Sequence, residues 1–207
     1  MELSNITFAG PAIEESSPLE EVLPMNLLEL LRQVNGFIQY GGGLHVRGIC
    51  SKPEWHSLAL AMQGPNALYL SYPELSPTDI PFAQDCMADQ FILRDGVVFR
   101  LESETGNLEC LRLSLSNFLE RAQEEPIEFL SMHPLLQYQS ENQSYLEPGK
   151  VLHAYPPYCT AEAENGVHLA AVPIADAIAY LAQLSSCLRN LDEGEAFDIK
   201  IINSPSG

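Results

Sequence analysis

The sequence predicts an α+β fold: an antiparallel-rich sheet with a central three-stranded meander, and helices packed mainly on one face of that sheet. Three observations support this fold class. An Asp-Gly dipeptide joins two apolar runs in the middle of the chain, and a second glycine-containing turn follows shortly after it. The chain then changes from a period of two, which is typical of strands, to helical spacing.

The meander occupies residues 80–119. Asp95-Gly96 favours a two-residue hairpin because both central residues of such a turn need a positive φ. Counting outward from the turn gives three cross-strand pairs: Leu93 with Val98, Ile92 with Phe99 and Phe91 with Arg100. The side chains of Ile92, Phe99 and Leu101 then share one face, which we expect to be buried in the core.

A second turn at residues 104–107 returns the chain through a third strand at residues 108–113. Helical spacing follows at once. The apolar positions that carry it are Leu115, Phe118, Leu119 and Ala122.

Before the meander the chain alternates short helices and strands. Residues 1–16 read as a leader with little structure, in which Ile6 and Phe8 could add a short edge strand. A capping box at Ser17 starts a helix that Pro24 kinks or divides. The buried stripe of this helix consists of Leu27, Leu28, Leu31 and Val34, and Asn35-Gly36 ends it.

Residues 39–43 form a glycine-rich turn that matches neither a P-loop nor a dinucleotide fingerprint, so we expect a flexible turn. Strands are predicted at residues 44–50 and 67–71. Between them a second capping box predicts a short helix whose inward residues are Trp55, Leu58, Ala59 and Met62. A proline-rich loop at residues 72–81 leads into the meander.

These patterns divide the chain into a leader at 1–16, a core at 17–130, a connection at 131–149 and a C-terminal extension at 150–207. The connection is rich in Gln, Ser, Asn and Pro and has few periodic apolar residues. In the extension, the apolar pattern predicts strands at 150–155 and 168–172, a helix from Ile174 to Leu191 and a last strand at 197–202. A unit this small needs support, so we expect it to pack on the core.

Several of these segments together resemble the SUKH superfamily, with the Smi/Knr-like branch closest. The resemblance covers residues 19–130. The segments, in order, are Leu23-Pro24, Asn35-Gly36, Ile80-Pro81-Phe82-Ala83, Asp85, Asp89-Gln90-Phe91, Asp95-Gly96-Val97, Glu104-Thr105-Gly106 and Phe118-Leu119. One departure is Ala88, where many members of the family have glycine. The resemblance implies a binding role: bacterial members look like immunity proteins of polymorphic toxin systems, and fungal ones like interaction hubs in cell-wall regulation.

The composition favours a folded, acidic protein. Apolar residues make up 46% and charged residues 18%, a balance that disordered chains do not show. Ten Lys and Arg residues stand against 28 Asp and Glu residues, giving a net charge of −18. This charge argues against binding to nucleic acid or anionic lipid and favours a basic partner, although a solvated surface alone also explains it.

No recognisable reactive site is present. The five cysteines include no C-x-x-C pair, and Cys110 and Cys187 fall on patterned elements, so we expect core thiols. Two possible metal sets are His45 with Cys50 and His56, and His153 with Cys159 and His168, but neither matches a zinc spacing. We therefore predict no catalytic residue, no metal and no cofactor.

The sequence with its resemblance thus predicts a non-enzymatic, cytoplasmic protein-binding module, an immunity protein for a basic toxin domain such as a nuclease. The predicted partner-binding residues are Tyr40, Tyr72, Asp79, Asp85, Asp89, Glu102 and Glu104. Two alternatives stay open: a regulatory scaffold with several weak partners, and an enzyme with an unrecognised Cys/His site. Trp55, Tyr155 and Tyr158 are further aromatic candidates for an interface, and Trp55 is more simply explained as core.

Overall fold

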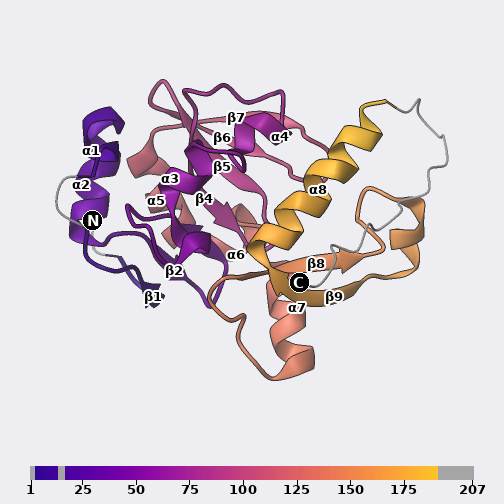
Figure 1. Cartoon of the computed structure of the whole chain (residues 1–207). Helices are drawn as coiled ribbons and strands as arrows, with labels where there is room; N and C mark the ends of the chain where they lie inside the picture. Colours follow the sequence, from indigo (N-terminus) through magenta and orange to yellow (C-terminus); the bar gives the residue numbers. More distant parts are fainter. Residues whose placement is uncertain (1–2, 14–16, 191–207) are drawn as a thin grey trace.

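The computed structural model describes residues 3–13 and 17–190, and within them the chain has the α+β fold that the sequence predicts. The main sheet has seven strands, and each pairs antiparallel with the next along the chain (Figure 1). These strands are β1 (Ile6–Ala9), β2 (Phe37–Gln39), β3 (Leu44–Val46), β4 (Ile80–Asp85), β5 (Gln90–Arg94), β6 (Val97–Leu101) and β7 (Leu108–Leu113). A second, two-stranded sheet pairs β8 (Lys150–Tyr155) with β9 (His168–Pro173).

Short helices fill the connections between the strands. They are α1 (Leu19–Val22), α2 (Met25–Gln33), α3 (Leu58–Met62), α4 (Leu68–Ser71), α5 (Leu115–Glu124), α6 (Pro126–Phe129), α7 (His133–Asn142) and α8 (Ile174–Leu188), with 3₁₀ turns η1 (Glu54–His56) and η2 (Ala161–Asn165). In the part of the chain that the structure describes, no helix combines the length and apolar character that a membrane crossing requires.

The central hairpin has the predicted register. Leu93 pairs with Val98 and Ile92 with Phe99, and the turn residues Asp95 and Gly96 have φ values of 50° and 79°. Positive φ at both positions matches the twist that a two-residue turn needs between antiparallel strands. The local Asp-Gly signal therefore determined how β5 and β6 align.

The sheet is buried on both faces at its centre. On one face, Phe91 and Phe82 pack against Phe118 of α5, with ring centroids 4.7 and 5.5 Å from it, and α2 adds Leu27 and Leu31. This is the larger core. It forms because alternate strand positions point to the same side and meet the apolar stripes of the two helices.

The other face carries the predicted core positions Ile92 and Leu101, which are fully buried, with Phe99 partly buried beside them. Tyr72 closes this core after α4, and Ile178 of α8 packs against it. Figure 1 shows α8, in yellow, crossing the sheet on this side. The C-terminal unit therefore helps to cover the second face of the sheet.

Three segments differ from the sequence-based expectation. The predicted strand at 67–71 is wrong: residues 68–71 form helix α4, and a short apolar run does not distinguish the two states. The helix expected around Trp55 is divided into η1 and α3. The expected connection at 131–149 contains helix α7, whose buried residue is Leu135.

The glycine-rich turn after β2 is covered by this connection. A Cβ atom on Gly42 would lie 2.8 Å from Leu146, and one on Gly43 would lie 2.7 Å from Met132. The connection packs directly against the turn, so a Cβ atom at either glycine would require the Leu146 or Met132 side chain to shift.

Two of the N-terminal expectations agree with the structure, whereas the expected capping box at Ser17 is wrong, because the N-cap of α1 is Pro18 and no side chain caps the helix. Residues 6–9 form the edge strand β1, and Pro24 divides α1 from α2. In the C-terminal unit the expected strands and helix are β8, β9 and α8, while the predicted strand at 197–202 lies outside the described residues.

Candidate partner-binding cleft

The turn between β4 and β5 places two carboxylates side by side. Asp85 Oδ1 accepts hydrogen bonds from the backbone N–H groups of Met87 (2.9 Å) and Asp89 (3.0 Å). Ala88 between them has a φ of 68°, a left-handed conformation that suits glycine better than alanine. This tight turn brings Asp85 and Asp89 to the same end of the central strands.

Arg100, on the neighbouring strand β6, bridges both acids. Its Nη2 lies 3.0 Å from Asp85 Oδ2 and 2.8 Å from Asp89 Oδ2, and its Nη1 donates to Ser131 Oγ at 3.1 Å. One guanidinium therefore serves two carboxylates in a partly buried site. With both carboxylates ionised, the cluster of Asp85, Asp89 and Arg100 would carry a net charge of −1.

Burial raises the pKa values of both carboxyl groups. For Asp85 the loss of solvent and the neighbouring Asp89 charge outweigh Arg100, and the pKa is about 8. Burial also raises the pKa of Asp89, against the opposing effect of Arg100. The pair therefore holds a proton more tightly than two exposed carboxylates would.

Glu104 connects this region to the C-terminal unit. Its Oε1 accepts from the backbone N–H of Tyr158 (3.2 Å), and its Oε2 accepts from that of Cys159 (3.0 Å). Burial raises the pKa of Glu104, and the two backbone hydrogen bonds oppose that rise. Glu102, two residues earlier, accepts a hydrogen bond from the hydroxyl of Thr105 at 3.0 Å.

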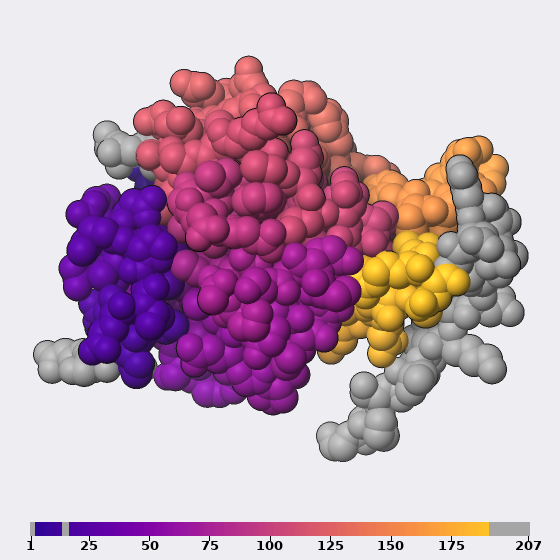
Figure 2. Space-filling view, turned by 90° about the horizontal axis from the view of Figure 1, so that it is seen from above, coloured from indigo at the N-terminus to yellow at the C-terminus, as the bar shows by residue number. Residues whose placement is uncertain are grey.

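These acids line a cleft of about 430 Å³ between the meander and the C-terminal unit. We call it the acidic cleft. Its charged and aromatic lining includes Asp89, Arg100, Glu102, Glu104, His153 and Tyr158. Figure 2 shows the C-terminal unit, in orange and yellow, as a lobe beside the body of the molecule. The arrangement can accept a cationic side chain, because carboxylates outnumber the single guanidinium.

The structure brings together four of the seven residues predicted to bind a partner: Asp85, Asp89, Glu102 and Glu104. Asp85 is itself buried beneath the cleft and acts through Arg100 rather than at the surface. Sequence reasoning found these acids because they flank the turns of the meander.

The other three predicted residues lie elsewhere. Tyr72 is wrong as a contact residue: it is fully buried, and its hydroxyl donates to Ser103 O at 3.1 Å. Asp79 is also buried and forms an ion pair with Arg94 (2.6 Å). Tyr40 is half-buried at the end of β2, where its hydroxyl donates to Ala122 O. A loop position in the sequence did not mean exposure for Tyr72 or Asp79.

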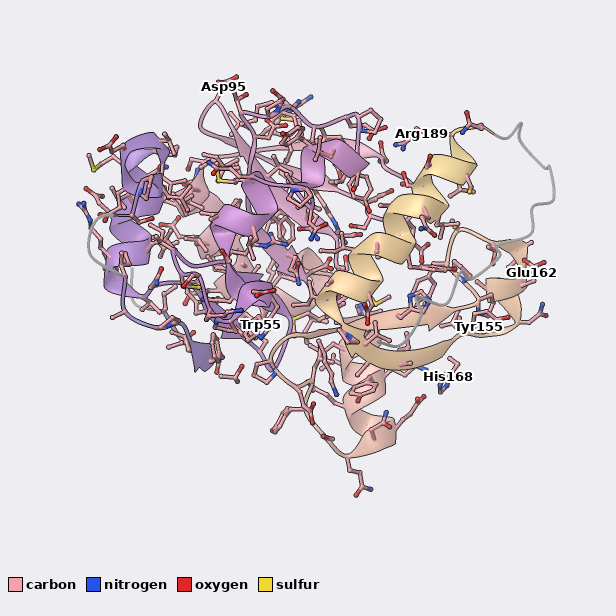
Figure 3. The ribbon with its side chains drawn as sticks, in the orientation of Figure 1. Trp55, Asp95, Tyr155, Glu162, His168 and Arg189 are labelled. Atoms are coloured by element: carbon pink, nitrogen blue, oxygen red, sulfur yellow. The ribbon has the colours of Figure 1, made fainter. Side chains whose placement is uncertain are left out.

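Tyr158, His153 and Cys159 also line the cleft, although the sequence did not assign them to it. Tyr158 was recognisable only as an aromatic residue in a loop. Figure 3 shows the exposed Tyr155 and His168 at the far end of the same β8–β9 sheet. Tyr158 lies 54 positions after Glu104, the cleft residue that it contacts.

The cysteines differ from expectation. Cys110 on the edge strand β7 and Cys187 near the end of α8 are exposed, so the prediction that both are core residues is wrong. Cys159 lines the cleft together with His133 and His153, but burial and Glu104 raise the pKa of its thiol to about 11. A protonated thiol is a poor nucleophile, so this cysteine is not activated.

The two histidines considered as metal ligands do meet. His45 Nε2 and His56 Nδ1 lie 2.9 Å apart and are hydrogen-bonded to each other. Within residues 3–13 and 17–190, no group of three or more His, Cys, Asp or Glu side chains is arranged to hold a metal ion.

Comparison with known proteins gives one structural likeness to report. No protein-family model and no curated protein matches this chain. A crystal structure of Atu4351 from Agrobacterium tumefaciens is similar at 13% sequence identity, with a TM-score of 0.48, over 86% of this chain and 85% of that one.

Proposed function

We propose that this protein is a non-enzymatic binding module that neutralises a basic toxin domain by forming a complex with it in the cytoplasm. The observation that carries the proposal is the acidic cleft, in which Asp89, Glu102 and Glu104 converge in a chain of net charge −18. The resemblance to the SUKH superfamily supports the immunity role.

In this mechanism the net charge affects the rate of encounter, and the cleft provides the contact with the partner. The negative field of the whole chain accelerates encounter with a basic partner, an effect that salt weakens. The cleft then receives a lysine or arginine side chain, where partial burial strengthens each charge-assisted hydrogen bond. Tyr158, at the cleft wall, offers a large amphipathic surface of the kind found at binding hot spots.

The first experiment is purification of the tagged protein from its native host at moderate salt. A single basic protein recovered at a one-to-one ratio supports the proposal. Many substoichiometric partners would replace it with the regulatory scaffold. Recovery of no protein at all would count against a stable complex.

A matched pair of variants then tests the cleft with that partner. Glu102→Gln combined with Glu104→Gln removes two cleft charges, and the amide at position 104 keeps one oxygen acceptor, so one of the two backbone N–H groups of Tyr158 and Cys159 loses its partner. The control, Glu162→Gln with Glu164→Gln, removes the same charge from the exposed turn η2. We expect about tenfold weaker binding for the cleft variant only. Equal weakening by both variants would assign the effect to net charge and refute the cleft as the binding site.

An enzyme using the cleft is the second candidate, because Cys159, His133 and His153 line it together. The raised pKa of the Cys159 thiol argues against an enzyme with Cys159 as its nucleophile. Substituting each histidine in turn discriminates the two: an enzyme loses its activity at one position, whereas a binding module keeps most of its affinity.

A further inference from the structure

Arg47 is a buried cation that forms no ion pair with any carboxylate of residues 3–13 and 17–190. Its side chain extends from the end of β3 and is 3% exposed. Its Nη1 donates to Pro81 O at 2.8 Å, and its Nη2 donates to Gln84 Oε1 at 2.6 Å and Gln90 Oε1 at 2.7 Å. All of these acceptors are neutral oxygens.

Most of the other Lys and Arg side chains in the described chain differ from Arg47, and the two that form no ion pair, Arg112 and Arg121, are exposed to solvent. Arg32, Lys52, Arg94, Arg100, Lys150 and Arg189 each lie in an ion pair with a carboxylate. Burial alone lowers the pKa of Arg47, to about 10, with no carboxylate near enough to oppose it. In so acidic a protein, the absence of an acidic partner at its most buried arginine is notable, because a buried charge is costly unless it is paired.

Arg47 lines a cavity of about 500 Å³ that is separate from the acidic cleft. The cavity lies between the α3–α4 region and the first turns of α8. Its walls are mainly apolar, formed by Trp55, Leu60, Ala61, Leu68, Ile174 and Ile178. A cavity of this size with apolar walls and few polar groups is the usual form of a small-molecule site.

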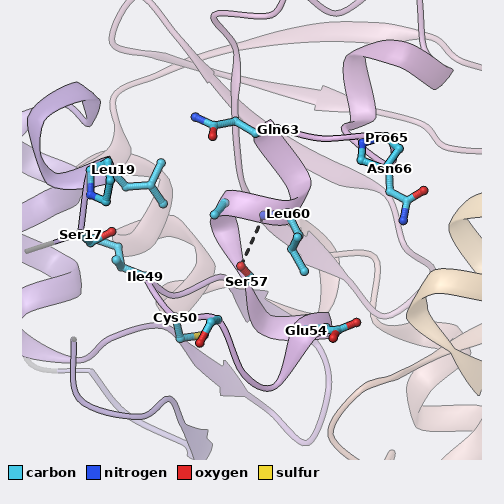
Figure 4. A pocket seen from close by; sticks show the side chains of 13 residues that line it. Ser17, Leu19, Ile49, Cys50, Glu54, Ser57, Leu60, Gln63, Pro65 and Asn66 are labelled. Carbon is cyan, nitrogen blue, oxygen red and sulfur yellow. Dashed lines mark hydrogen bonds between the residues drawn. The ribbon is translucent and has the colours of Figure 1, made fainter.

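A second hollow, of about 550 Å³, shares residues of α3 and the preceding turn with the cavity. Figure 4 shows that hollow, with Ser57 Oγ accepting from the backbone N–H of Leu60 at the start of the helix. No cationic side chain lines the hollow, so it lacks the charge that distinguishes the Arg47 cavity.

Helix α8 adds a second source of positive potential at the cavity. It is fifteen residues long, its N-terminal residues Ile174 and Ala175 line the cavity, and no side chain caps it. One N–H, that of Ile174, donates to Gly149 O. The aligned peptide dipoles of such a helix favour an anion at its N-terminus.

Two acidic residues, Glu54 and Asp176, belong to elements that border the cavity. Glu54 lines the cavity but is exposed and paired with Lys52. Asp176 lies in the first turn of α8 and is exposed. Neither forms an ion pair with Arg47.

We infer that this cavity binds a carboxylate on an apolar body, such as an aryl-alkanoic acid, with the carboxylate toward Arg47 and the N-terminus of α8 and the apolar body against Leu60 and Ile178. A carboxylate supplies the charge that the buried guanidinium lacks, and the apolar walls exclude water around the pair. This site is independent of the acidic cleft, so either can fail without the other.

The test compares 4-phenylbutyrate with its neutral amide, 4-phenylbutyramide, by calorimetry on the full chain. We expect the acid to bind at least about tenfold more tightly, because the two probes differ only in the charged group. Equal affinities, or no saturable binding at millimolar probe, would overturn the inference.

Variants locate the site. Ala179→Phe fills the cavity from an exposed position on α8, while Gln183→Phe places the same side chain one turn further along, where it lines no described cavity. Only Ala179→Phe should weaken binding of the acid. Equal weakening by both variants refutes the location.

Arg47→Gln should reduce the preference for acid over amide, with thermal unfolding measured in parallel because the side chain also holds Gln84 and Gln90. If Arg47→Gln does not fold, Ala179→Phe still tests whether the acid binds in this cavity. A short peptide ending in phenylalanine, compared as free acid and as amide, tests whether the carboxylate comes from a protein C-terminus or from a small acid. If the free-acid peptide binds more tightly than 4-phenylbutyrate, the cavity is assigned to a protein C-terminus. If it binds more weakly, the cavity is assigned to a small acid.

Discussion

His45 and His56 form a buried hydrogen-bonded pair whose tautomers are determined by their surroundings. His56 Nε2 lies 3.0 Å from Asn35 O, so this nitrogen must carry the hydrogen and donate it. His56 Nδ1 therefore accepts, and His45 Nε2 donates to it across 2.9 Å. Both rings are neutral in this arrangement, because burial and the nearby Arg47 lower the pKa values of both.

The first prediction concerns acid stability. A histidine whose pKa is lower in the folded than in the unfolded state loses stability as the pH falls below about 6.5, because the unfolded chain takes up the proton first. The buried carboxyls with raised pKa values act in the opposite direction between pH 7 and pH 5, so the histidine effect is measured as a difference from the wild type. We expect His45→Gln to lose less stability than the wild type between pH 7 and pH 5, as measured by the urea midpoint. His168→Gln, at an exposed position, is the control and should leave the pH dependence of the midpoint unchanged. The same pH dependence in all three proteins would contradict the neutral pair.

The second prediction concerns the opposite pH range. Asp85 has a folded pKa of about 8, above its usual value, so the folded state holds a proton that the unfolded state has released. The Asp85 contribution should therefore fall as the pH rises from about 4 to 8. Between pH 6.5 and 8 the histidine effect is small, and Asp85→Asn should flatten the decrease measured there. Asp95→Asn in the exposed hairpin turn is the matched control. The measurement is the urea midpoint at each pH. If Asp85→Asn leaves the pH dependence of the midpoint unchanged, the raised pKa of Asp85 is refuted.

The third prediction compares a buried with an exposed arginine. At neutral pH, where Asp85 holds its proton, Arg100→Met leaves Asp89 without its cation and removes a hydrogen-bond donor to Asp85, and it should cost about 1.5–3 kcal/mol of unfolding free energy. Arg32→Met breaks the more exposed pair with Glu20 and should cost under about 1 kcal/mol. Chemical denaturation measures both, and similar costs would mean that Arg100 is no more important than a surface charge.

The fourth prediction concerns Tyr72, which the structure removes from the partner surface. Tyr72→Phe takes away the hydroxyl that donates to Ser103 O and should destabilise the fold by about 1 kcal/mol. Partner binding should not change, because no part of the ring is exposed. Tyr145→Phe, at an exposed position, serves as the control for stability. Weaker partner binding by Tyr72→Phe, with the fold intact, would return this residue to the interface.

Local physical chemistry explains what could be predicted from the sequence. The Asp95-Gly96 turn requires positive φ at both positions, and the period-two pattern on either side then determines the register and the buried face of β5 and β6. Pro24 likewise places the boundary between α1 and α2, although neither helix has a side-chain cap. Where a short apolar run offered no periodicity, as at residues 68–71, the sequence did not distinguish helix from strand.

The candidate site depended on longer-range contacts. The acids in the meander turns are predicted to bind a partner, and that role stays a prediction. The structure brings Asp89, Glu102 and Glu104 to one cleft, because alternate turns of a meander lie at the same end of the sheet. The sequence did not show that Glu104 would meet Tyr158, since that contact spans fifty-four positions and depends on how the C-terminal unit packs.

The sequence by itself determined the local conformations: the hairpin register, the apolar stripes of α2 and α5, and the strand-strand-helix order of the C-terminal unit. Tertiary structure decided which side chains water reaches. Packing of α8 and α4 on the second sheet face buries Tyr72, whereas Cys110 stays exposed because β7 is an edge strand. The physical reason is that φ and ψ preferences and periodicity act over a few residues, whereas burial and charge pairing depend on segments that meet only in the folded chain.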